Sequence, residues 1–264
     1  MYMLRQHKIS ILQKKIEHLN NTALPFVMLF HIQNLELLQD VLSVEEQRLM
    51  ERFLHPYEQQ RRFVSFALRR LVLSWIHKQS PQTLNFKSNA YGRPFLPSVK
   101  DDFNISHSGD WIAFLYSPSF HLYGTCGVDV QEHGCTFDDA MMHFCLSEEE
   151  KACNEHLHTK DRFALFAQKE AASKALGLGL HLPFHQLVPK PLQKKNACVF
   201  VTSFIDLLPS YSLSVAFTKG NPTSVSCLIF HSSSKNETYE NIFMHQGAYS
   251  TSYQVESTSL LNSF

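Results

Sequence analysis

The sequence lacks a net charge and any long apolar run, and each absence argues against a class of protein. Its 264 residues include 24 Lys and Arg against 24 Asp and Glu, so the formal net charge is zero. Non-specific binding to nucleic acid needs a strong basic excess, and a membrane-spanning helix needs about 20 consecutive apolar residues. The apolar stretch ISIL near the N-terminus is too short for a signal peptide. We therefore expect a cytoplasmic protein that binds neither nucleic acid nor membrane.

The sequence also has few cysteines, and its six cysteines form no C-x-x-C pair. Their spacings match no common zinc template, and a free cysteine is usually a small core residue. Buried cysteines and surface histidines are the preferred interpretation, and a zinc-dependent interaction module is the alternative. The region rich in both residue types contains Cys126, His133, Cys135, His143, Cys145, Cys153, His156 and His158.

Apolar patterning and turn residues predict an α+β protein. The apolar run LPFVMLFHI (24–32) is expected to be a buried strand, followed by two helical segments broken near Pro56. The turn Ser108-Gly109-Asp110 predicts a hairpin of two short strands. Beyond it we expect a strand at GVDV, helical residues 137–158, a helix ending in FAQKEAASKALGLG and three more strands.

Four segments follow from this order of elements, with two halves of similar size and a boundary near residue 125. The last segment is rich in Ser, Asn, Thr and Gln, a composition that packs poorly. The predicted segments are an amphipathic or frayed leader at 1–23, an N-terminal half at 24–125, a C-terminal half at 126–231 and a polar tail at 232–264.

The helix that ends in FAQKEAASKALGLG carries a carboxylate and an ammonium on one stripe. At about 100° per residue, Phe163, Phe166, Glu170, Lys174 and Gly177 fall close together on the helix surface. Glu170 and Lys174 are either an ordinary solvent-facing ion pair, worth about 0.3 kcal/mol, or a pair aimed at a substrate. The expected solvent face carries Arg162, Lys169 and Ser173, and Ala164, Ala167, Ala171 and Ala175 flank the stripe on its other side.

GVDV (127–130) places a carboxylate inside a strand. Alternate residues of a strand share a face, so Asp129 and Gln131 project to one side and the two valines to the other. An aspartate there either has a partner or meets a backbone N–H or an arginine at the strand end. Joined to Glu170, Asp129 would make an oxygen-rich site suited to a hard cation such as magnesium.

NISHS (104–108) is suited to phosphate contact rather than to hydrolysis. Asn104, Ser106 and Ser108 share one strand face and His107 lies on the other, so the Ser and His side chains diverge. There is no G-x-S-x-G turn either, which disfavours a hydrolase triad. Further candidates for binding an anion are Arg48, Arg61, Arg62 and Arg93.

Taken in order, GRP, FNISHSGDW, GVDV and F-x-x-KEAxxKxxGxGL resemble the Sfp-type 4′-phosphopantetheinyl transferases, from about Leu24 to about Ser232. The resemblance implies two pseudo-symmetric α+β halves in a monomer, with coenzyme A bound in the cleft between them. It implies transfer of the phosphopantetheine arm to a serine of an acyl or peptidyl carrier protein, with release of 3′,5′-ADP. Such carriers serve fatty acid, polyketide and nonribosomal peptide synthesis.

The resemblance also implies a magnesium site on the coenzyme A diphosphate. Asp129 and Glu170 would be ligands, with Gln131 at a position where many relatives have Glu. An amide oxygen brings no charge, so Gln131 supports the alternative of a coenzyme A- or carrier-binding protein that has lost catalysis. A glutamate of CLSEEEK would assist, and spacing favours Glu149 over its rival Glu148.

The remaining roles are implied for the phosphates and the proton transfers. Glu170 would take the proton from the carrier serine, and Lys174 would stabilise or protonate the leaving phosphate. Phe166 stands where the family usually has Trp, which is a packing change. The residues expected to touch phosphate are Arg61, Arg93, Ser106, His107 and Lys174.

Overall fold

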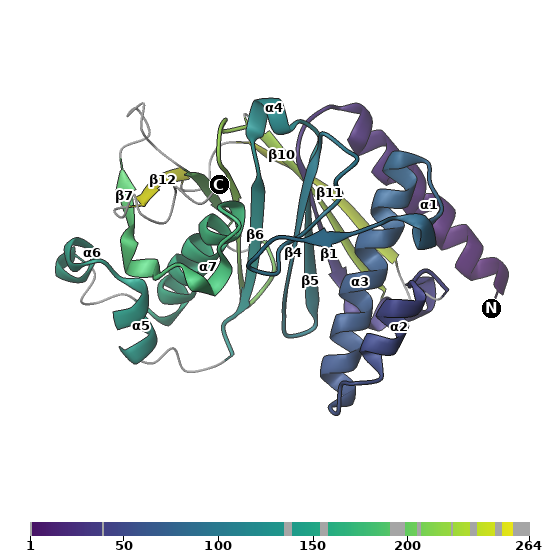
Figure 1. Ribbon diagram of the computed structural model, residues 1–264, viewed down its shortest axis with the longest axis horizontal. Helices are drawn as coiled ribbons and strands as arrows, with labels where there is room; N and C mark the ends of the chain where they lie inside the picture. Colours follow the sequence, from purple (N-terminus) through teal and green to yellow (C-terminus); the bar gives the residue numbers. More distant parts are fainter. Residues whose placement is uncertain are drawn as a thin grey trace.

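The computed structural model is a mixed α+β protein in which two sheets pack together between outer helices (Figure 1). It describes residues 2–38, 40–134, 139–153, 158–190, 199–204, 207–222, 224–232, 237–245 and 250–255. Three groups of buried apolar side chains define the layers: one between the N-terminal helices and the first sheet, one between the sheets, and one under the C-terminal helices. Within the described ranges, no helix is both long and apolar enough to cross a bilayer. The predicted fold class is confirmed.

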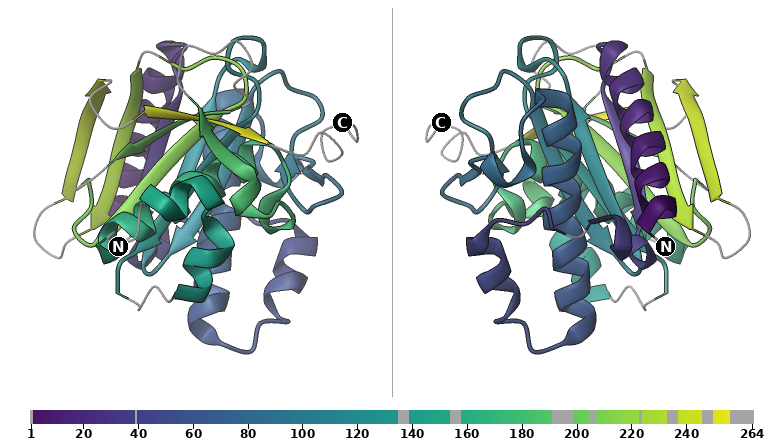
Figure 2. Two further views of the ribbon diagram at one scale, coloured as in Figure 1. Left: turned by 90° about the vertical axis from the view of Figure 1, so that its left-hand side faces the viewer. Right: turned by 90° about the vertical axis from the view of Figure 1, so that its right-hand side faces the viewer.

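The N-terminal half is a sheet with strand order β11-β10-β1-β5-β4, in which β1 and β10 are parallel neighbours. Helices cover its outer face, and Figure 2 shows α1 and α3 side by side there. The strands are β1 (Phe26–His31), β4 (Asp102–Ser108), β5 (Trp111–Ser117), β10 (Ser224–Ser232) and β11 (Glu237–His245), with a small hairpin of β2 (Lys87–Ser88) and β3 (Pro94–Phe95). The helices are α1 (Tyr2–Asn21), α2 (Val44–Met50), α3 (Pro56–His77) and α4 (Phe120–Tyr123), with 3-10 turns η1 (Ile32–Leu38) and η2 (Pro81–Thr83).

The C-terminal half is a second sheet with strand order β6-β9-β8-β12-β7. Helix α7 crosses its outer face and α5 and α6 lie beyond it (Figure 1). The strands are β6 (Cys126–Glu132), β7 (Leu187–Lys190), β8 (Val199–Phe204), β9 (Tyr211–Phe217) and β12 (Ser250–Val255). The helices are α5 (Asp139–Cys145), α6 (Glu148–Cys153) and α7 (Thr159–Ala175), with 3-10 turns η3 (Gly179–His181) and η4 (Phe184–Gln186).

Local sequence explains the helix break and the hairpin. Pro56 occupies the first turn of α3, where its missing N–H costs no hydrogen bond. Gly109 turns the chain between β4 and β5 with a φ of +50°. The predicted strand at 24–32, the break near Pro56 and the hairpin at Ser108-Gly109-Asp110 are confirmed.

Of the two alternatives for the leader the frayed one is wrong, and the predicted tail contains two strands. Residues 2–21 are a helix, α1, whose Leu12, Ile16 and Leu19 are buried in the core beside α3, so this segment is not frayed. The segment predicted to be a poorly packed tail supplies β11 and β12, which pair with β10 and with β7 and β8. Residues 256–264 lie outside the described part of the chain.

The boundary near residue 125 does not separate the sheets completely. Strand β10 comes from the predicted C-terminal half, yet it pairs with β1 from Phe26↔Ser226 to Phe30↔Phe230. Phe30 stacks on Phe230 at 5.2 Å between ring centroids. The chain therefore crosses back to the first sheet for β10 and β11, before β12 joins the second sheet.

The halves repeat one another in topology and in sequence. Each has a strand, a long helix and a hairpin, and the orders β1-β5-β4 and β6-β9-β8 correspond. Helix α3 contains RFVSFALR (62–69) and α7 contains RFALFAQK (162–169), and LSVEE (42–46) corresponds to LSEEE (146–150). Only the C-terminal copy has Glu170 and Lys174, where the N-terminal copy has Arg70 and Ser74.

A buried ion pair recurs at the same place in both halves. Ser43 and Glu46 form a capping box at the start of α2, and Glu46 is bound by Arg69 and Arg70 of α3. In the C-terminal half, Glu150 is bound by Lys169 of α7. Lys169 has no exposed surface and also donates to the carbonyl oxygens of Cys145 at 2.7 Å and Phe184 at 3.2 Å.

Replacing Lys169 with Met is expected to lower the free energy of unfolding by about 3 kcal/mol or more, because it leaves the Glu150 carboxylate buried without its cation. The double variant Lys169→Met/Glu150→Gln should recover part of that loss. Urea unfolding followed by circular dichroism measures both. The matched control is Lys160→Met, which removes an exposed lysine of the same helix. A loss in Lys169→Met no greater than in the control would contradict the prediction.

Candidate active site

A row of polar side chains on β4 joins the two sheets. Strand β6 is an edge of the second sheet, so alternate backbone N–H groups of β6 need a partner outside it. Every second residue of β4 accepts one of them, and we call this row of contacts the seam. In each contact a side-chain oxygen of β4 accepts a hydrogen bond from a backbone N–H of β6. Asp102 accepts from Cys126 at 2.7 Å, Asn104 from Val128 at 3.0 Å, Ser106 from Val130 at 3.5 Å and Ser108 from Glu132 at 3.0 Å.

Asp129 is fully buried at the seam, and its carboxylate accepts three side-chain hydrogen bonds. The Oγ of Ser106 donates to Oδ1 at 2.7 Å, and the Nζ of Lys174 donates to the same oxygen at 2.6 Å. The Nε2 of Gln131 donates to Oδ2 at 2.7 Å. The predicted common face of Asp129 and Gln131 is confirmed by this contact.

Glu170 and Lys174 of α7 complete a cluster of two carboxylates around one ammonium. Nζ of Lys174 lies 3.0 Å from Oε1 of Glu170, and Nε2 of Gln131 lies 3.4 Å from its Oε2. The side chains of Glu170 and Lys174 are only 16% and 19% exposed. They are therefore not an ordinary solvent-facing pair, and the alternative, that they are aimed at a substrate, stays a prediction.

The predicted solvent face of α7 is wrong for two of its three residues. Lys169 and Ser173 are fully buried. Lys169 reaches Glu150, and the Oγ of Ser173 donates to the carbonyl oxygen of Gly179. Buried alanines on the flank let the neighbouring elements approach, so α7 is covered on more sides than its polar residues suggest.

A glycine sets how closely α7 lies against β6. A Cβ built on Gly127 would fall onto the carbonyl oxygen of Ala171 and 2.5 Å from the backbone nitrogen of Ala175. Any side chain at this position would push the helix away from the strand. Since Gly127 is two residues from Asp129, and Ala171 and Ala175 lie beside Glu170 and Lys174, this contact fixes the distance between the charged groups.

The charges of the cluster shift one another's pKa values. Burial, followed by the negative charge of Glu170, raises the pKa of Asp129 to about 6, although Lys174 and Ser106 oppose the shift. Burial disfavours the ammonium of Lys174, but the carboxylates of Asp129 and Glu170 outweigh it and raise the Lys174 pKa. The cluster thus holds Lys174 charged and carries more acidic than basic groups.

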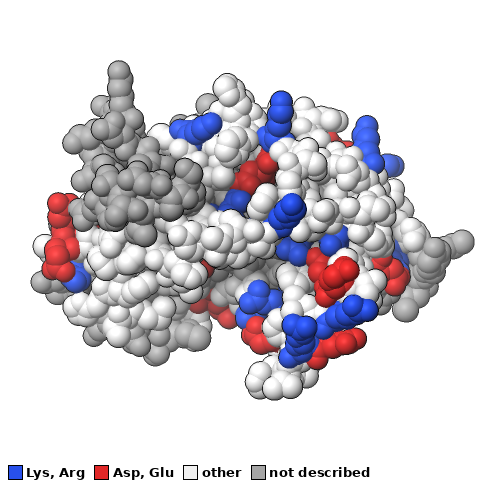
Figure 3. Space-filling model, in the orientation of Figure 1, with Lys and Arg blue, Asp and Glu red and all other residues white. Residues whose placement is uncertain are grey.

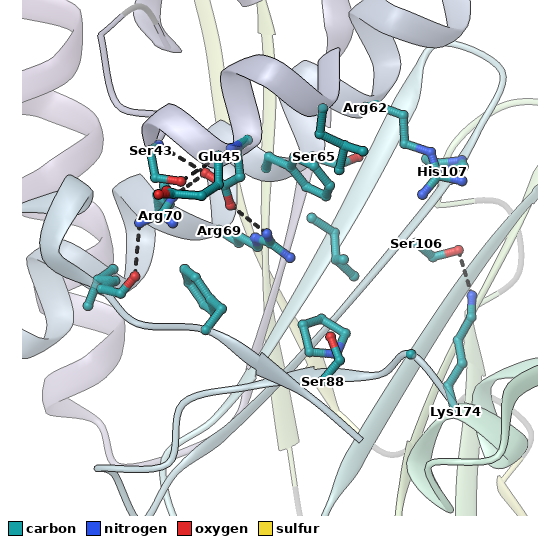
Figure 4. Close-up of a pocket in the computed structure, with 18 of the residues that line it drawn as sticks. Ser43, Glu45, Arg62, Ser65, Arg69, Arg70, Ser88, Ser106, His107 and Lys174 are labelled. Carbon is teal, nitrogen blue, oxygen red and sulfur yellow. Dashed lines mark hydrogen bonds and ion pairs between the residues drawn. The ribbon is translucent and has the colours of Figure 1, made fainter. Parts of the chain in front are cut away.

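The cluster lies at one end of a cavity of about 910 Å³. The cavity runs from the base of α2 and α3, past the hairpin β2–β3, to β4, β6 and α7 (Figure 4). At the other end Arg69 lies over the rings of Phe66 and Phe86, at 4.3 and 4.5 Å. Figure 4 places Arg62 and His107 on the same side of the cavity as Ser106 and Lys174, away from Ser43 and Arg70. The space-filling view shows mixed acidic and basic side chains over α2 and α3, and a largely uncharged face over α5 and α7 (Figure 3).

Most of the predicted site residues are brought together at this cavity. Those that line it are Ser106, His107, Asp129, Gln131, Glu170 and Lys174. Arg61 does not line it, because its guanidinium is held by both carboxylate oxygens of Glu58 at 2.6 and 2.7 Å. The next residue, Arg62, lines the cavity instead.

The structure does not bring Glu149 or Glu148 to the cluster. Ser147 and Glu150 form a capping box, in which the Ser147 N–H donates to Glu150 and the Glu150 N–H donates to Ser147. The two glutamates between them then point to solvent, and Glu148 pairs with Lys151. The third glutamate of the run is the buried one, which spacing from Asp129 did not indicate.

Arg93 is also placed away from the cavity wall. Its guanidinium donates to Asp102 of the seam and to three backbone carbonyl oxygens. Sequence patterns did not indicate the seam contact of Asp102 or the cavity positions of Arg69 and Arg70. The internal repeat could have indicated that Arg69 has a structural role, because it aligns Arg69 with Lys169.

The cysteine-rich region is described only in part. Cys126, Cys145 and Cys227 are buried free thiols, and burial raises the pKa of each. Cys135 and His156 lie outside the described residues. Among the residues that the structure does describe, no three His, Cys, Asp or Glu side chains are grouped as metal ligands would be.

The cluster fits the magnesium ion that the resemblance implies. Its donors are carboxylate oxygens of Asp129 and Glu170, which suit a hard cation that keeps water and phosphate ligands. Gln131 now presents its Nε2 to both carboxylates, and turning the amide would present Oε1 to a cation instead. We therefore assign these three side chains as the residues that would hold it.

His107 gives the protein a measurable pH dependence. Burial, followed by the positive charges of Arg61, Arg62 and Lys174, lowers the pKa of His107 from 6.5 to about 4. Between these values only the unfolded chain binds this proton, so His107 contributes stability that is complete above pH 6.5 and is lost as the pH falls towards 4.

His107→Gln is therefore expected to reduce the loss of stability between pH 7 and pH 5 by about 2 kcal/mol. Urea unfolding of both proteins at the two pH values measures it. An equal loss in wild type and variant would contradict the prediction.

Two family models match the chain, and together they cover more than half of it. The model of the 4′-phosphopantetheinyl transferase superfamily matches residues 125–223. The model of the N-terminal part of 4′-phosphopantetheinyl transferase matches residues 31–119. The first match contains Asp129, Glu170 and Lys174, and the second contains Ser106 and His107.

Several bacterial proteins are similar to the chain. A 4′-phosphopantetheinyl transferase of Bacillus subtilis is 29% identical over 146 residues, which is 54% of this chain and 63% of that relative. The 4′-phosphopantetheinyl transferase Sfp of Bacillus subtilis strain 168 is 27% identical over 146 residues, with the same coverage. The 4′-phosphopantetheinyl transferase gsp of Aneurinibacillus migulanus is 27% identical over 150 residues, 54% of this chain and 60% of that relative. The chain thus spans less than two thirds of the length of these relatives.

Proposed function

The chain belongs to the 4′-phosphopantetheinyl transferase superfamily, and on that premise we propose that it transfers the 4′-phosphopantetheine arm of coenzyme A to a carrier-protein serine. The acceptor is an acyl or peptidyl carrier protein, and the second product is 3′,5′-ADP. The observation that carries the proposal is the cluster of Asp129, Glu170 and Lys174 at one end of a cavity of ligand size.

Glu170 and Lys174 act on the two oxygens of the reaction, the attacking one and the leaving one. The serine oxygen attacks the phosphorus that bears the pantetheine arm, and the bond from that phosphorus to the 3′,5′-ADP oxygen breaks. Glu170 accepts the serine proton, directly or through a water molecule. Lys174, held charged by Asp129 and Glu170, stabilises or protonates the leaving phosphate oxygen. Arg62 and His107, which line the cavity on the side of Ser106 and Lys174, contact the phosphates.

Magnesium, held by Asp129, Glu170 and Gln131, would neutralise the diphosphate and polarise the phosphorus under attack. Because Gln131 brings no charge, two carboxylates share this role. Ser106 holds Asp129 through its hydroxyl and keeps that carboxylate facing the cavity.

The partner is a carrier protein that docks beside the cavity. Exposed Met141, Phe144 and Leu180 supply apolar surface on the C-terminal half, and Arg62 supplies positive charge at the cavity. An acidic helix of the carrier would meet both. The protein would act as a cytoplasmic monomer, since one chain contains both halves of the site.

The test is to mix the protein with coenzyme A, magnesium and an apo carrier protein and to weigh the carrier by intact mass spectrometry. The proposal predicts a gain equal to the phosphopantetheine group, and no gain without coenzyme A. The alternative is a coenzyme A- or carrier-binding protein without catalysis, which Gln131 supports. Coenzyme A binding with no mass gain across several carriers would favour that alternative and overturn the proposed activity.

A further inference from the structure

A groove beside the short helix α4 lies apart from the cavity that holds the cluster (Figure 1). It consists of two adjoining hollows of about 600 and 650 Å³, which have Val99, Asp101 and Phe120 as common wall residues. The hairpin β2–β3 separates it from the cavity, since Pro94 lines the cavity and the next residue, Phe95, lines the first hollow. We call the two hollows the α4 groove, and it shares no lining residue with the cavity.

The first hollow has mostly apolar walls. Phe120 closes one side of it and remains 45% exposed, and Leu122 on the same helix is 57% exposed. A hollow of this size with an apolar lining suits an apolar group of a ligand. Its apolar wall includes Phe95, Leu96, Val99, Phe103, Phe120 and Leu176.

Asp101 stands where the two hollows meet, and its side chain is only 9% exposed. Its Oδ2 accepts a hydrogen bond from the Tyr116 hydroxyl at 2.6 Å and lies 3.1 Å from Nε2 of His77. Its Oδ1 has no hydrogen-bond partner within the described ranges. A nearly buried carboxylate oxygen without a partner is costly, so a ligand that donates a hydrogen bond here is favoured. The other acidic residue of the groove, Asp102, is already bound by Arg93.

The second hollow carries positive charge. Lys100, His121 and Lys219 line it and are exposed, and Asp101 is its only acidic wall residue among those described. Nζ of Lys219 lies 4.9 Å from the centroid of the Phe120 ring. Neither lysine forms an ion pair within the part of the chain that the structure describes. This end of the groove therefore attracts an anionic group.

An apolar hollow, a hydrogen-bond acceptor and a cationic hollow in succession fit a peptide in which an apolar residue directly precedes acidic ones. The apolar side chain would enter the first hollow, a backbone N–H would meet Asp101, and a carboxylate would meet Lys100 and Lys219. A fatty acid has no donor for Asp101, and a small anion has no apolar group. We propose that the α4 groove binds such a peptide segment of a partner protein. The site is separate from the proposed transfer site and goes beyond that function.

The test selects peptides on the whole protein from a phage library of random nine-residue sequences. The most enriched peptide is then synthesised with a fluorescein label, and its Kd is measured by fluorescence anisotropy. We expect the enriched sequences to carry Leu, Ile or Phe directly before Asp or Glu. Lys100→Glu/Lys219→Glu should weaken the Kd by about 10-fold or more, and Val99→Trp, which fills the groove, by a similar factor.

The matched control is Lys14→Glu/Lys160→Glu, which makes the same change of net charge at exposed lysines of α1 and α7. It should keep the Kd within about twofold of wild type. Urea unfolding of every variant checks that it is folded, and the two lysine pairs change only exposed side chains.

Several results would overturn the proposal. They are no enrichment of any peptide, enriched sequences without acidic residues, and an equal loss of affinity in the control. A loss in Phe144→Asp but not in Val99→Trp would place the peptide on the C-terminal half, where the carrier is proposed to dock. Binding of decanoate without binding of any peptide would make the groove a fatty acid site. The test uses neither coenzyme A nor a carrier, so a failure of the proposed transfer activity leaves its result intact.

Discussion

Glu170→Gln and Lys174→Met are each expected to reduce the rate of arm transfer by about 10³-fold, equivalent to about 4 kcal/mol of transition-state stabilisation. Glutamine cannot accept the serine proton, and methionine cannot stabilise the leaving phosphate. Single-turnover transfer measured by intact mass separates these effects from product release. Both variants remove a charge from one partly buried cluster, so their effects will not be additive.

The matched control for these variants is Glu149→Gln. The resemblance implies a metal-assisting role for Glu149, whereas its side chain is exposed on α6, away from the cavity. We expect the wild-type rate in this variant. A loss close to that of Glu170→Gln would show that Glu149 reaches the site during the reaction, and an unchanged rate in Glu170→Gln would remove Glu170 from the proton transfer.

The second large effect is expected at a residue with no side chain. Gly127→Ala should lower the transfer rate by about 100-fold and the free energy of unfolding by about 2 kcal/mol. The added Cβ would meet the backbone of Ala171 and Ala175, which is too rigid to yield locally, so α7 must move away from β6. Glu170 and Lys174 would then move away from Asp129.

Gly134→Ala is the control for this substitution, because a Cβ there meets only the side chain of Glu132, at 3.7 Å. Transfer rates and urea unfolding of both variants, with the wild type, complete the comparison. We expect a large change at Gly127 and almost none at Gly134. Equal behaviour of the two variants would mean that the close approach of α7 to β6 does not position the cluster.

Much of the candidate site follows from the period of each element. The strand period of two predicted that Asp129 and Gln131 share one face of their strand and that Ser106 and His107 lie on opposite faces. The helical period predicted that Glu170 and Lys174 share one stripe of α7. These residues lie at the cavity because strand and helix geometry is local and is little altered by what packs around it. The same reasoning predicted the helix break at Pro56, where the cause is a missing N–H.

What could not be predicted depends on contacts between distant segments. Lys169 is fully buried because Glu150 and the backbone of η4 lie beside it, and a helical wheel contains neither. Arg93 looked free to bind phosphate because the seam that holds it forms only in the folded chain. Strand β10 returns to the first sheet, and no local pattern indicates which sheet a strand will join.

The capping box of α6 shows the remaining difficulty. Three consecutive glutamates look equivalent in the sequence, and spacing from Asp129 favoured the second of them. The serine before them selects the third, since the box joins Ser147 to Glu150, and the other two become surface residues. The pattern of a capping box was present in the sequence, but such a pattern indicates where a helix starts and not which glutamate binds a metal.

We propose that coenzyme A and a divalent cation bind at the cluster of Asp129, Glu170 and Lys174. The most direct test is a crystal structure of the protein with coenzyme A and manganese, in which anomalous scattering locates the metal. We expect an anomalous peak within ligand distance, about 2 Å, of carboxylate oxygens of Asp129 and Glu170, with the diphosphate beside Lys174. Coenzyme A bound elsewhere, or a metal peak away from both carboxylates, would contradict it.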